Sequence, residues 1–192
     1  MRRILLLSCL FSLTFMSLFA DSSILRARYS GITRQDSARV MNIPEQARNY
    51  FMSIKEDSPY YKDAQEMLYY INDCTPLRIS DEELLRYTRV QSWQATTYGL
   101  FKYKFFPCSI RLEGNTLFFQ KLKGSQRKAG LIYRWMDKVM LFTGAWGIED
   151  EPILPYGSDR SEVAVIFHPT DDVILFLFPQ TDDSFEIYKL IP

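Results

Sequence analysis

A glutamine and an arginine, Gln126 and Arg127, stand side by side in the most polar stretch of the chain, residues 123–130. An arginine guanidinium can form two parallel hydrogen bonds with a carboxylate or a phosphate, and a neighbouring glutamine amide can both donate and accept. We therefore predict that Ser125, Gln126 and Arg127 form part of a ligand-binding site. The alternative is an ordinary turn, in which Arg127 pairs with an acidic residue of the C-terminal strands.

Three aromatic residues further along the chain, Tyr133, Trp146 and Tyr156, are candidates for the walls of the same site. Each offers a flat apolar face together with a polar edge. They are equally compatible with a role in the core, because aromatic residues make up 15% of the chain and many of them must fill its interior.

Residue types that support catalysis are scarce. His168 is the sole histidine, so the chain has neither the ligand spacing of a zinc site nor a second base for a serine triad. The acid pairs at residues 171–172 and 182–183 fall in turns, where aspartate bonds its own backbone, although the paired carboxylates of a glycosidase would look the same. Residues 149–151 lack the alternating ligands of a calcium loop, and residues 124–130 lack the strand-to-helix context of a phosphate loop. We predict no catalytic residue, no metal site and no cofactor.

The first twenty residues are typical of a secretory signal peptide. Arg2 and Arg3 precede an uncharged apolar run over residues 4–19, and Ala20 precedes polar sequence. We expect cleavage after Ala20 and a periplasmic location. A retained anchor is the alternative, but the run is shorter than the roughly 20 residues needed to cross a bilayer. Contact with a membrane is therefore expected only through this segment, if it is not removed.

The charges of the chain are balanced overall but not evenly distributed. Loss of Arg2 and Arg3 leaves 21 of the 23 basic residues against 23 acidic ones, which does not favour a nucleic-acid partner. Residues 102–138 carry nine basic and two acidic residues, whereas residues 149–192 carry ten acidic and two basic residues. This pattern indicates either complementary charges on neighbouring strands or a basic face for an anionic partner.

Two cysteines, Cys74 and Cys108, remain after removal of the signal peptide. An even number of cysteines in an oxidising compartment predicts a disulfide. It would close a loop of about 35 residues and stabilise the fold by roughly 3–4 kcal/mol. The alternative is two buried thiols that do not meet.

Helical patterns occupy the first half of the chain after the signal peptide. Thr33 followed by Asp36 predicts a helix start, with a short helix to about Met41, and Pro44 predicts the start of a second helix. The clearest helix has apolar residues at i, i+3, i+4 and i+7 between residues 64 and 71.

From about residue 85 the apolar period becomes two residues or continuous, which predicts eight strands with short connections. Such strands form a sandwich or a closed up-and-down barrel, and closure removes exposed edges. We predict an α+β fold: a signal peptide (1–20), a helical lead-in packed on the barrel (21–84), and an eight-stranded antiparallel up-and-down β-barrel or half-closed barrel (85–192). The long acidic loop, residues 147–161, is expected to lie over one end and to meet the turn at residues 123–130.

Four short runs stand out along the strands: Cys108-Ser109-Ile110, Lys121-Leu122-Lys123-Gly124-Ser125-Gln126-Arg127, Gly130-Leu131-Ile132-Tyr133, and the C-terminal Leu190-Ile191-Pro192. Together they resemble an exported bacterial family catalogued only as a domain of unknown function. The resemblance covers most of the chain after the signal peptide. It implies compartment and domain extent, and no activity.

Since a histidine cluster and a convincing nucleophile are missing, the sequence favours a non-catalytic binding module of the cell envelope. Its partner would be a small ligand or an envelope protein. The alternative is an envelope hydrolase that uses carboxylates in the turns between strands.

Overall fold

The computed structural model describes residues 31–72, 79–135, 139–180 and 184–192. The predicted signal peptide lies outside this range. Residues 33–192 form one compact unit. Among the described helices, none is long and apolar enough to span a membrane.

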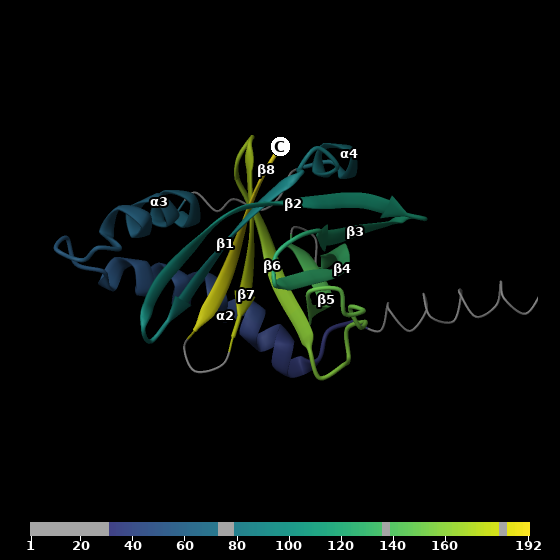
Figure 1. The fold of residues 1–192 in the computed structure, drawn as a ribbon, viewed down its shortest axis with the longest axis horizontal. Coiled ribbons are helices and arrows are strands. Elements are labelled where there is room, and N and C mark those ends of the chain that lie inside the picture. Colours follow the sequence, from purple (N-terminus) through teal and green to yellow (C-terminus); the bar gives the residue numbers. More distant parts are fainter. Residues whose placement is uncertain (1–30, 73–78, 136–138, 181–183) are drawn as a thin grey trace, which may run out of the picture. The chain divides into compact units, whose positions relative to one another are not determined.

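Eight antiparallel strands form a closed barrel in which each strand pairs with the next and the last returns to the first (Figure 1). The strands are β1 (Arg89–Thr96), β2 (Gly99–Glu113), β3 (Thr116–Lys121), β4 (Gln126–Trp135), β5 (Val139–Ile148), β6 (Ser161–Thr170), β7 (Val173–Pro179) and β8 (Phe185–Ile191). The prediction of an eight-stranded up-and-down barrel is therefore confirmed. Closure leaves no long unpaired edge to be covered.

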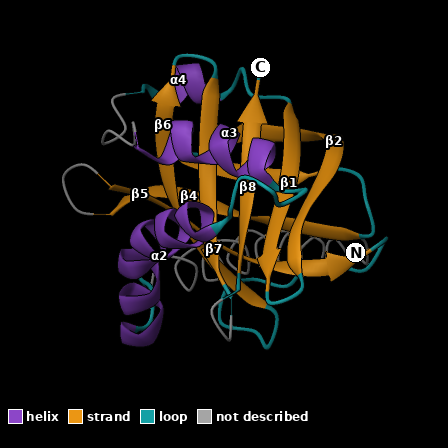
Figure 2. Cartoon of the chain, turned by 90° about the vertical axis from the view of Figure 1, so that its left-hand side faces the viewer, coloured by secondary structure: helices purple, strands orange, loops and turns teal. Residues whose placement is uncertain are grey.

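In the described part of the chain, three helices precede the strands: α2 (Arg34–Ser53), α3 (Tyr61–Asn72) and α4 (Asp81–Leu84). The first two cross the outer surface on one side of the barrel (Figure 2). Phe51 of α2 packs edge-on against Phe185 of β8, with ring centroids 5.7 Å apart. In α3, Glu66 lies 2.6 Å from the ammonium of Lys189 on β8 and 2.8 Å from that of Lys102 on β2.

The start of α2 agrees with the sequence prediction, since the Thr33 side chain caps it by accepting a hydrogen bond from the backbone of Asp36. The length of α2 differs from the prediction. The predicted break near Met41 is wrong, because one helix of 20 residues runs through Pro44. A proline inside a helix costs about 3 kcal/mol or more. That cost is offset because one apolar stripe continues on both sides of it and is buried: Val40, Ile43, Ala47 and Phe51.

One end of the barrel is filled by apolar side chains, and we call it the closed end. Residues 79–88 lie there, and α4 begins with a capping box in which Ser80 and Glu83 bond each other's backbone. Ile79, Leu84 and Tyr87 join the core of the barrel from this side. Inside, the rings of Phe119, Phe142, Phe176, Phe178 and Tyr188 form a chain of contacts with centroids 5.0–6.3 Å apart.

The strands β4 and β5 approach each other closely at a pair of glycines. Gly130 and Gly144 are directly opposite in the register. A Cβ at Gly144 would lie 2.1 Å from the carbonyl oxygen of Ala129, and one at Gly130 would lie 2.2 Å from that of Thr143. Only glycine fits at these two positions without moving the backbone.

Candidate functional site

The opposite end of the barrel, where β1 and β5 end and β4, β6 and β8 begin, contains a cavity of about 290 Å³, and we call it the open end. Much of its wall is polar but uncharged, with side chains of Gln94, Thr96, Gln126 and Gln180 next to the indole of Trp146. Three charged side chains complete it: Lys128, Glu162 and Glu186. The interior of the barrel is thus apolar toward one end and polar and hollow toward the other.

Lys128 of β4 bridges two carboxylates of other strands. Its ammonium lies 2.7 Å from Glu162 on β6 and 3.2 Å from Glu186 on β8, and the three side chains are only 5%, 10% and 8% exposed. The ammonium also lies 4.6 Å from the centre of the Phe178 ring. Each carboxylate has a second partner, because Ser92 donates to Glu186 and Gln180 donates to Glu162 at 3.3 Å.

Burial and the neighbouring charges shift the pKa values of Lys128 and Glu162. Burial opposes the charged form of Lys128, but Glu186 and Glu162 outweigh it and hold the pKa of Lys128 above its ordinary value. Burial raises the pKa of Glu162, since Lys128 is shared with a second carboxylate and compensates only in part. Lys128 is therefore a fixed positive charge, and Glu162 is the carboxyl that burial pushes toward its neutral form.

A second lysine lies within the barrel wall next to this cluster. The Lys121 ammonium is 5.1 Å from the centre of the Phe106 ring and 5.3 Å from that of Tyr188, and burial lowers its pKa. The Tyr188 hydroxyl is buried and has no hydrogen-bond partner among the described residues. Burial, reinforced by Glu186, raises the pKa of Tyr188 well above its ordinary value. With Lys121 counted, two buried lysines face two buried glutamates.

Of the residues predicted for a site, Gln126 and Trp146 lie in the cavity wall. Ser125 is exposed in the neighbouring turn, and its carbonyl accepts a hydrogen bond of 2.9 Å from the backbone of Glu149. Arg127 lies 3.9 Å from Asp150 and is directed at the carbonyl of Glu151 at 3.5 Å. The turn and the acidic loop therefore meet as expected, and the acid near Arg127 comes from that loop rather than from the C-terminal strands.

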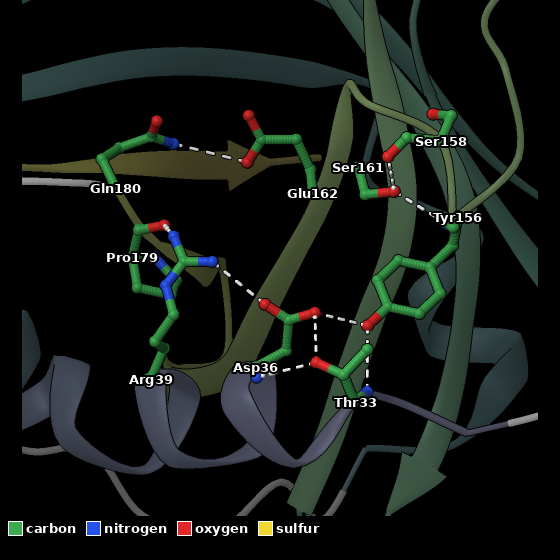
Figure 3. A network of polar contacts seen from close by, with 10 residues as sticks. Thr33, Asp36, Arg39, Tyr156, Ser158, Ser161, Glu162, Pro179 and Gln180 are labelled. Carbon is green, nitrogen blue, oxygen red and sulfur yellow. Dashed lines mark hydrogen bonds and ion pairs between the residues drawn. The ribbon is translucent and has the colours of Figure 1, made fainter.

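The other two predicted site residues do not line the cavity. Tyr133 is half-buried, and burial raises its pKa. Tyr156 belongs to the long loop; its hydroxyl donates to Asp36 and accepts from the backbone of Thr33 at 3.1 Å (Figure 3). Burial, followed by the Asp36 carboxylate, raises the pKa of Tyr156. Tyr156 thus ties the first turn of α2 to the barrel.

Sequence reasoning missed Lys128, Glu162 and Glu186 as site residues. A signal was present for Glu186, which is a charged residue between the apolar residues Phe185 and Ile187 of a strand-like run. In β8, Glu186 alternates with Tyr188 and Leu190 and so shares their inward face. A charge on the inward face of a barrel strand needs an opposite charge on another strand, which is what the structure shows.

The groups considered for catalysis lie elsewhere. Asp172, in the turn between β6 and β7 at the closed end, is 3.5 Å from Arg86 and 81% exposed. His168 lies near the end of β6, also toward the closed end of the barrel, and its buried Nε2 has no hydrogen-bond partner in the described part of the chain. Residues 182–183 lie outside the described residues.

Cys108 is buried in β2, 4% exposed, and has no disulfide partner among the described residues; burial raises the pKa of its thiol to about 12. Cys74 lies outside the described residues, so the disulfide stays a prediction. Intact-mass measurement with and without reductant, after alkylation, tests it. The predicted result is a protein with no alkylated cysteine until reductant is added; two alkylated thiols in the unreduced, unfolded protein would contradict the bond.

Residues 85–190 match the model of the family described as Domain of unknown function (DUF4893). The match covers β1 to β7 and all but the last residue of β8, and the chain belongs to this family. No curated protein and no solved structure matched the chain significantly.

Proposed function

We propose that this protein is a non-catalytic binding module of the bacterial cell envelope, which holds a small ligand at the open end of its barrel. The observation that carries the proposal is the cavity of about 290 Å³. Its wall brings together Gln126, Trp146 and the buried ion cluster of Lys128, Glu162 and Glu186. A concave site with a few converging polar groups is where small ligands usually bind. The N-terminal sequence, with its charged start and apolar run, supports export.

The architecture also supports binding rather than scaffolding alone. A barrel of eight strands can fill its interior completely with side chains or retain room for one small ligand. Here the closed end is packed with aromatic rings, whereas the open end is lined with glutamine amides and a buried ion cluster. Burying charges is costly, and hydrophobic residues of similar size would stabilise the fold equally well. Keeping polar groups at this position is expected of a site that recognises something polar.

The alternative, an envelope hydrolase using carboxylates of the turns, has less support. The described turn acid Asp172 is exposed and lies at the closed end, away from the cavity. The two buried carboxylates, Glu162 and Glu186, both face Lys128 at hydrogen-bonding distance. An ammonium held between two carboxylates occupies the space that a scissile bond and a water would need.

The experiment is native mass spectrometry of the protein isolated without unfolding from its own cell envelope. We expect a copurifying mass that is released on denaturation. The variant Gln126→Trp, which fills the mouth of the cavity from an exposed position, is expected to lose that mass. The matched control is Gln120→Trp on β3, where the replaced glutamine accepts from Arg111 on the outer surface. Equal retention of the mass by both variants would place the ligand elsewhere, and its absence from the wild-type protein would contradict the proposal.

A further inference from the structure

The cavity wall is rich in groups that are polar without being charged. The side-chain amide of Gln126 and the indole N–H of Trp146 line the cavity without a hydrogen-bond partner among the described residues. Gln94 accepts a hydrogen bond from the Tyr103 hydroxyl at 3.2 Å, which leaves its own N–H groups to donate. A primary amide both donates and accepts, so these groups can pair with hydroxyls, which also do both.

The charged groups at this site are already committed to one another. The Lys128 ammonium contacts Glu162 and Glu186 and faces the ring of Phe178, so it offers little to an anion. A ligand carboxylate or phosphate would therefore have to compete with two glutamates for that ammonium. A cation would in turn have to compete with Lys128 for the two carboxylates.

The carboxylate oxygens can nevertheless accept more hydrogen bonds. Each oxygen of Glu162 and Glu186 has one partner in the structure, whereas an ionised carboxylate provides about four acceptor sites. Hydroxyl groups of a ligand satisfy such acceptors without bringing a charge of their own. Hydrogen bonds to charged groups are stronger than those between neutral groups.

Trp146 provides a flat wall for a ring. The Arg160 guanidinium lies 4.9 Å from the centre of its indole and fixes it from one side, while the indole still forms part of the cavity wall. The C–H groups on the face of a sugar-like ring pack against such an aromatic surface, while its hydroxyls at the rim reach the surrounding amides and carboxylates.

From these observations we infer that the ligand of the open end is an uncharged polyhydroxylated ring compound, of the saccharide or cyclitol class. This inference rests on the proposed function of the same cavity and specifies its ligand. Since Lys128 is paired with Glu162 and Glu186, the site offers no unpaired charge in this cluster to either an anion or a cation.

The test is an NMR titration of the full exported chain labelled with ¹⁵N, observed at the tryptophan indole N–H signals. The chain has three tryptophans, and the variant Trp146→Phe identifies the signal of Trp146. Trp93 provides an internal control, because it is fully buried on the outer side of β1 and donates to Gln91 at 3.1 Å. The uncharged probes are trehalose, N-acetylglucosamine and inositol; succinate and putrescine are the charged probes.

We expect at least one uncharged probe to shift the Trp146 signal saturably, with the Trp93 signal unchanged and no response to succinate or putrescine. Gln126→Ala should weaken that binding about fivefold, as expected for one lost hydrogen bond, whereas Gln120→Ala should not change it. A response to a charged probe instead, or no response to any uncharged one, overturns the inferred class. In that case a copurifying mass that Gln126→Trp loses would still support binding at the open end. If no probe shifts the Trp146 signal and no mass copurifies, the proposed function is removed as well.

Discussion

Replacement of Lys128 by methionine removes the only ammonium that contacts both Glu162 and Glu186 in the described structure. Methionine has nearly the same length and leaves little empty space. The two carboxylates stay where they are, at 10% and 8% exposure, and keep only Gln180 and Ser92 as donors. The variant therefore isolates the electrostatic role of the lysine from its packing.

The expected loss is large. Removing one partner of a buried ion pair costs about 3–5 kcal/mol, since an uncompensated charge is left behind. For a chain of this size that corresponds to a fall in Tm of roughly 10 °C. The loss should shrink on acidification from neutral pH to about pH 5, because burial raises the pKa of Glu162 and Lys128 no longer offsets that rise, so this carboxyl becomes neutral more easily.

Lys102 provides the matched control. Its ammonium also contacts two carboxylates, Asp63 at 2.9 Å and Glu66 at 2.8 Å, but its side chain is 31% exposed. Lys102→Met should cost about 1 kcal/mol or less. Both variants are measured by urea denaturation at the two pH values. A Lys128→Met loss no larger than that of Lys102→Met, or one that does not depend on pH, would refute the account of the buried cluster.

Three further predictions concern single side chains. Tyr188→Phe removes a buried hydroxyl that has no partner among the described residues, so the free energy of unfolding should stay level or rise by up to about 1 kcal/mol; a clear loss in urea denaturation would show a hidden partner. Gly144→Ala places a Cβ 2.1 Å from the Ala129 carbonyl oxygen, and we expect a loss of about 3 kcal/mol or more, or no soluble protein; a wild-type melting curve would contradict that close approach. Burial alone would raise the pKa of Glu66, but the ammonium groups of Lys102 and Lys189 hold it below its ordinary 4.5. The ionised carboxylate therefore stabilises the fold above pH 4.5, and this contribution is lost as the pH falls through the lowered pKa. Glu66→Gln should therefore be less stable than wild type by roughly 1 kcal/mol at neutral pH and equal to it around pH 3, and a constant difference would argue against the ion pairs.

The barrel itself was predictable because strand period and short turns are local properties of the chain. Eight segments of period two, joined by short polar connections, leave few arrangements other than a barrel or a sandwich. The choice of a closed barrel is a long-range property, since it depends on the pairing of Arg89 with Ile191 and of the residues that follow them. The length of α2 was missed because tertiary packing of its apolar stripe overrode the local effect of Pro44.

The site was predictable only in part. Gln126 and Trp146 were found because glutamine and tryptophan suggest recognition by residue type alone. Lys128 and its two glutamates were missed because they come from β4, β6 and β8, and their contact depends on closure of the barrel and on which face each residue occupies. Tyr156 is a recognition residue by type, yet its hydroxyl is engaged with Asp36 of α2, a contact across 120 positions of sequence.

The most direct test of binding at the open end is a crystal structure of the protein purified from its own cell envelope without refolding. We expect electron density for a small molecule in the cavity, within hydrogen-bonding distance of Gln126 and the Glu162 and Glu186 carboxylates and in contact with Trp146. Ordered water alone in that cavity, together with a bound molecule at another surface, would contradict the account.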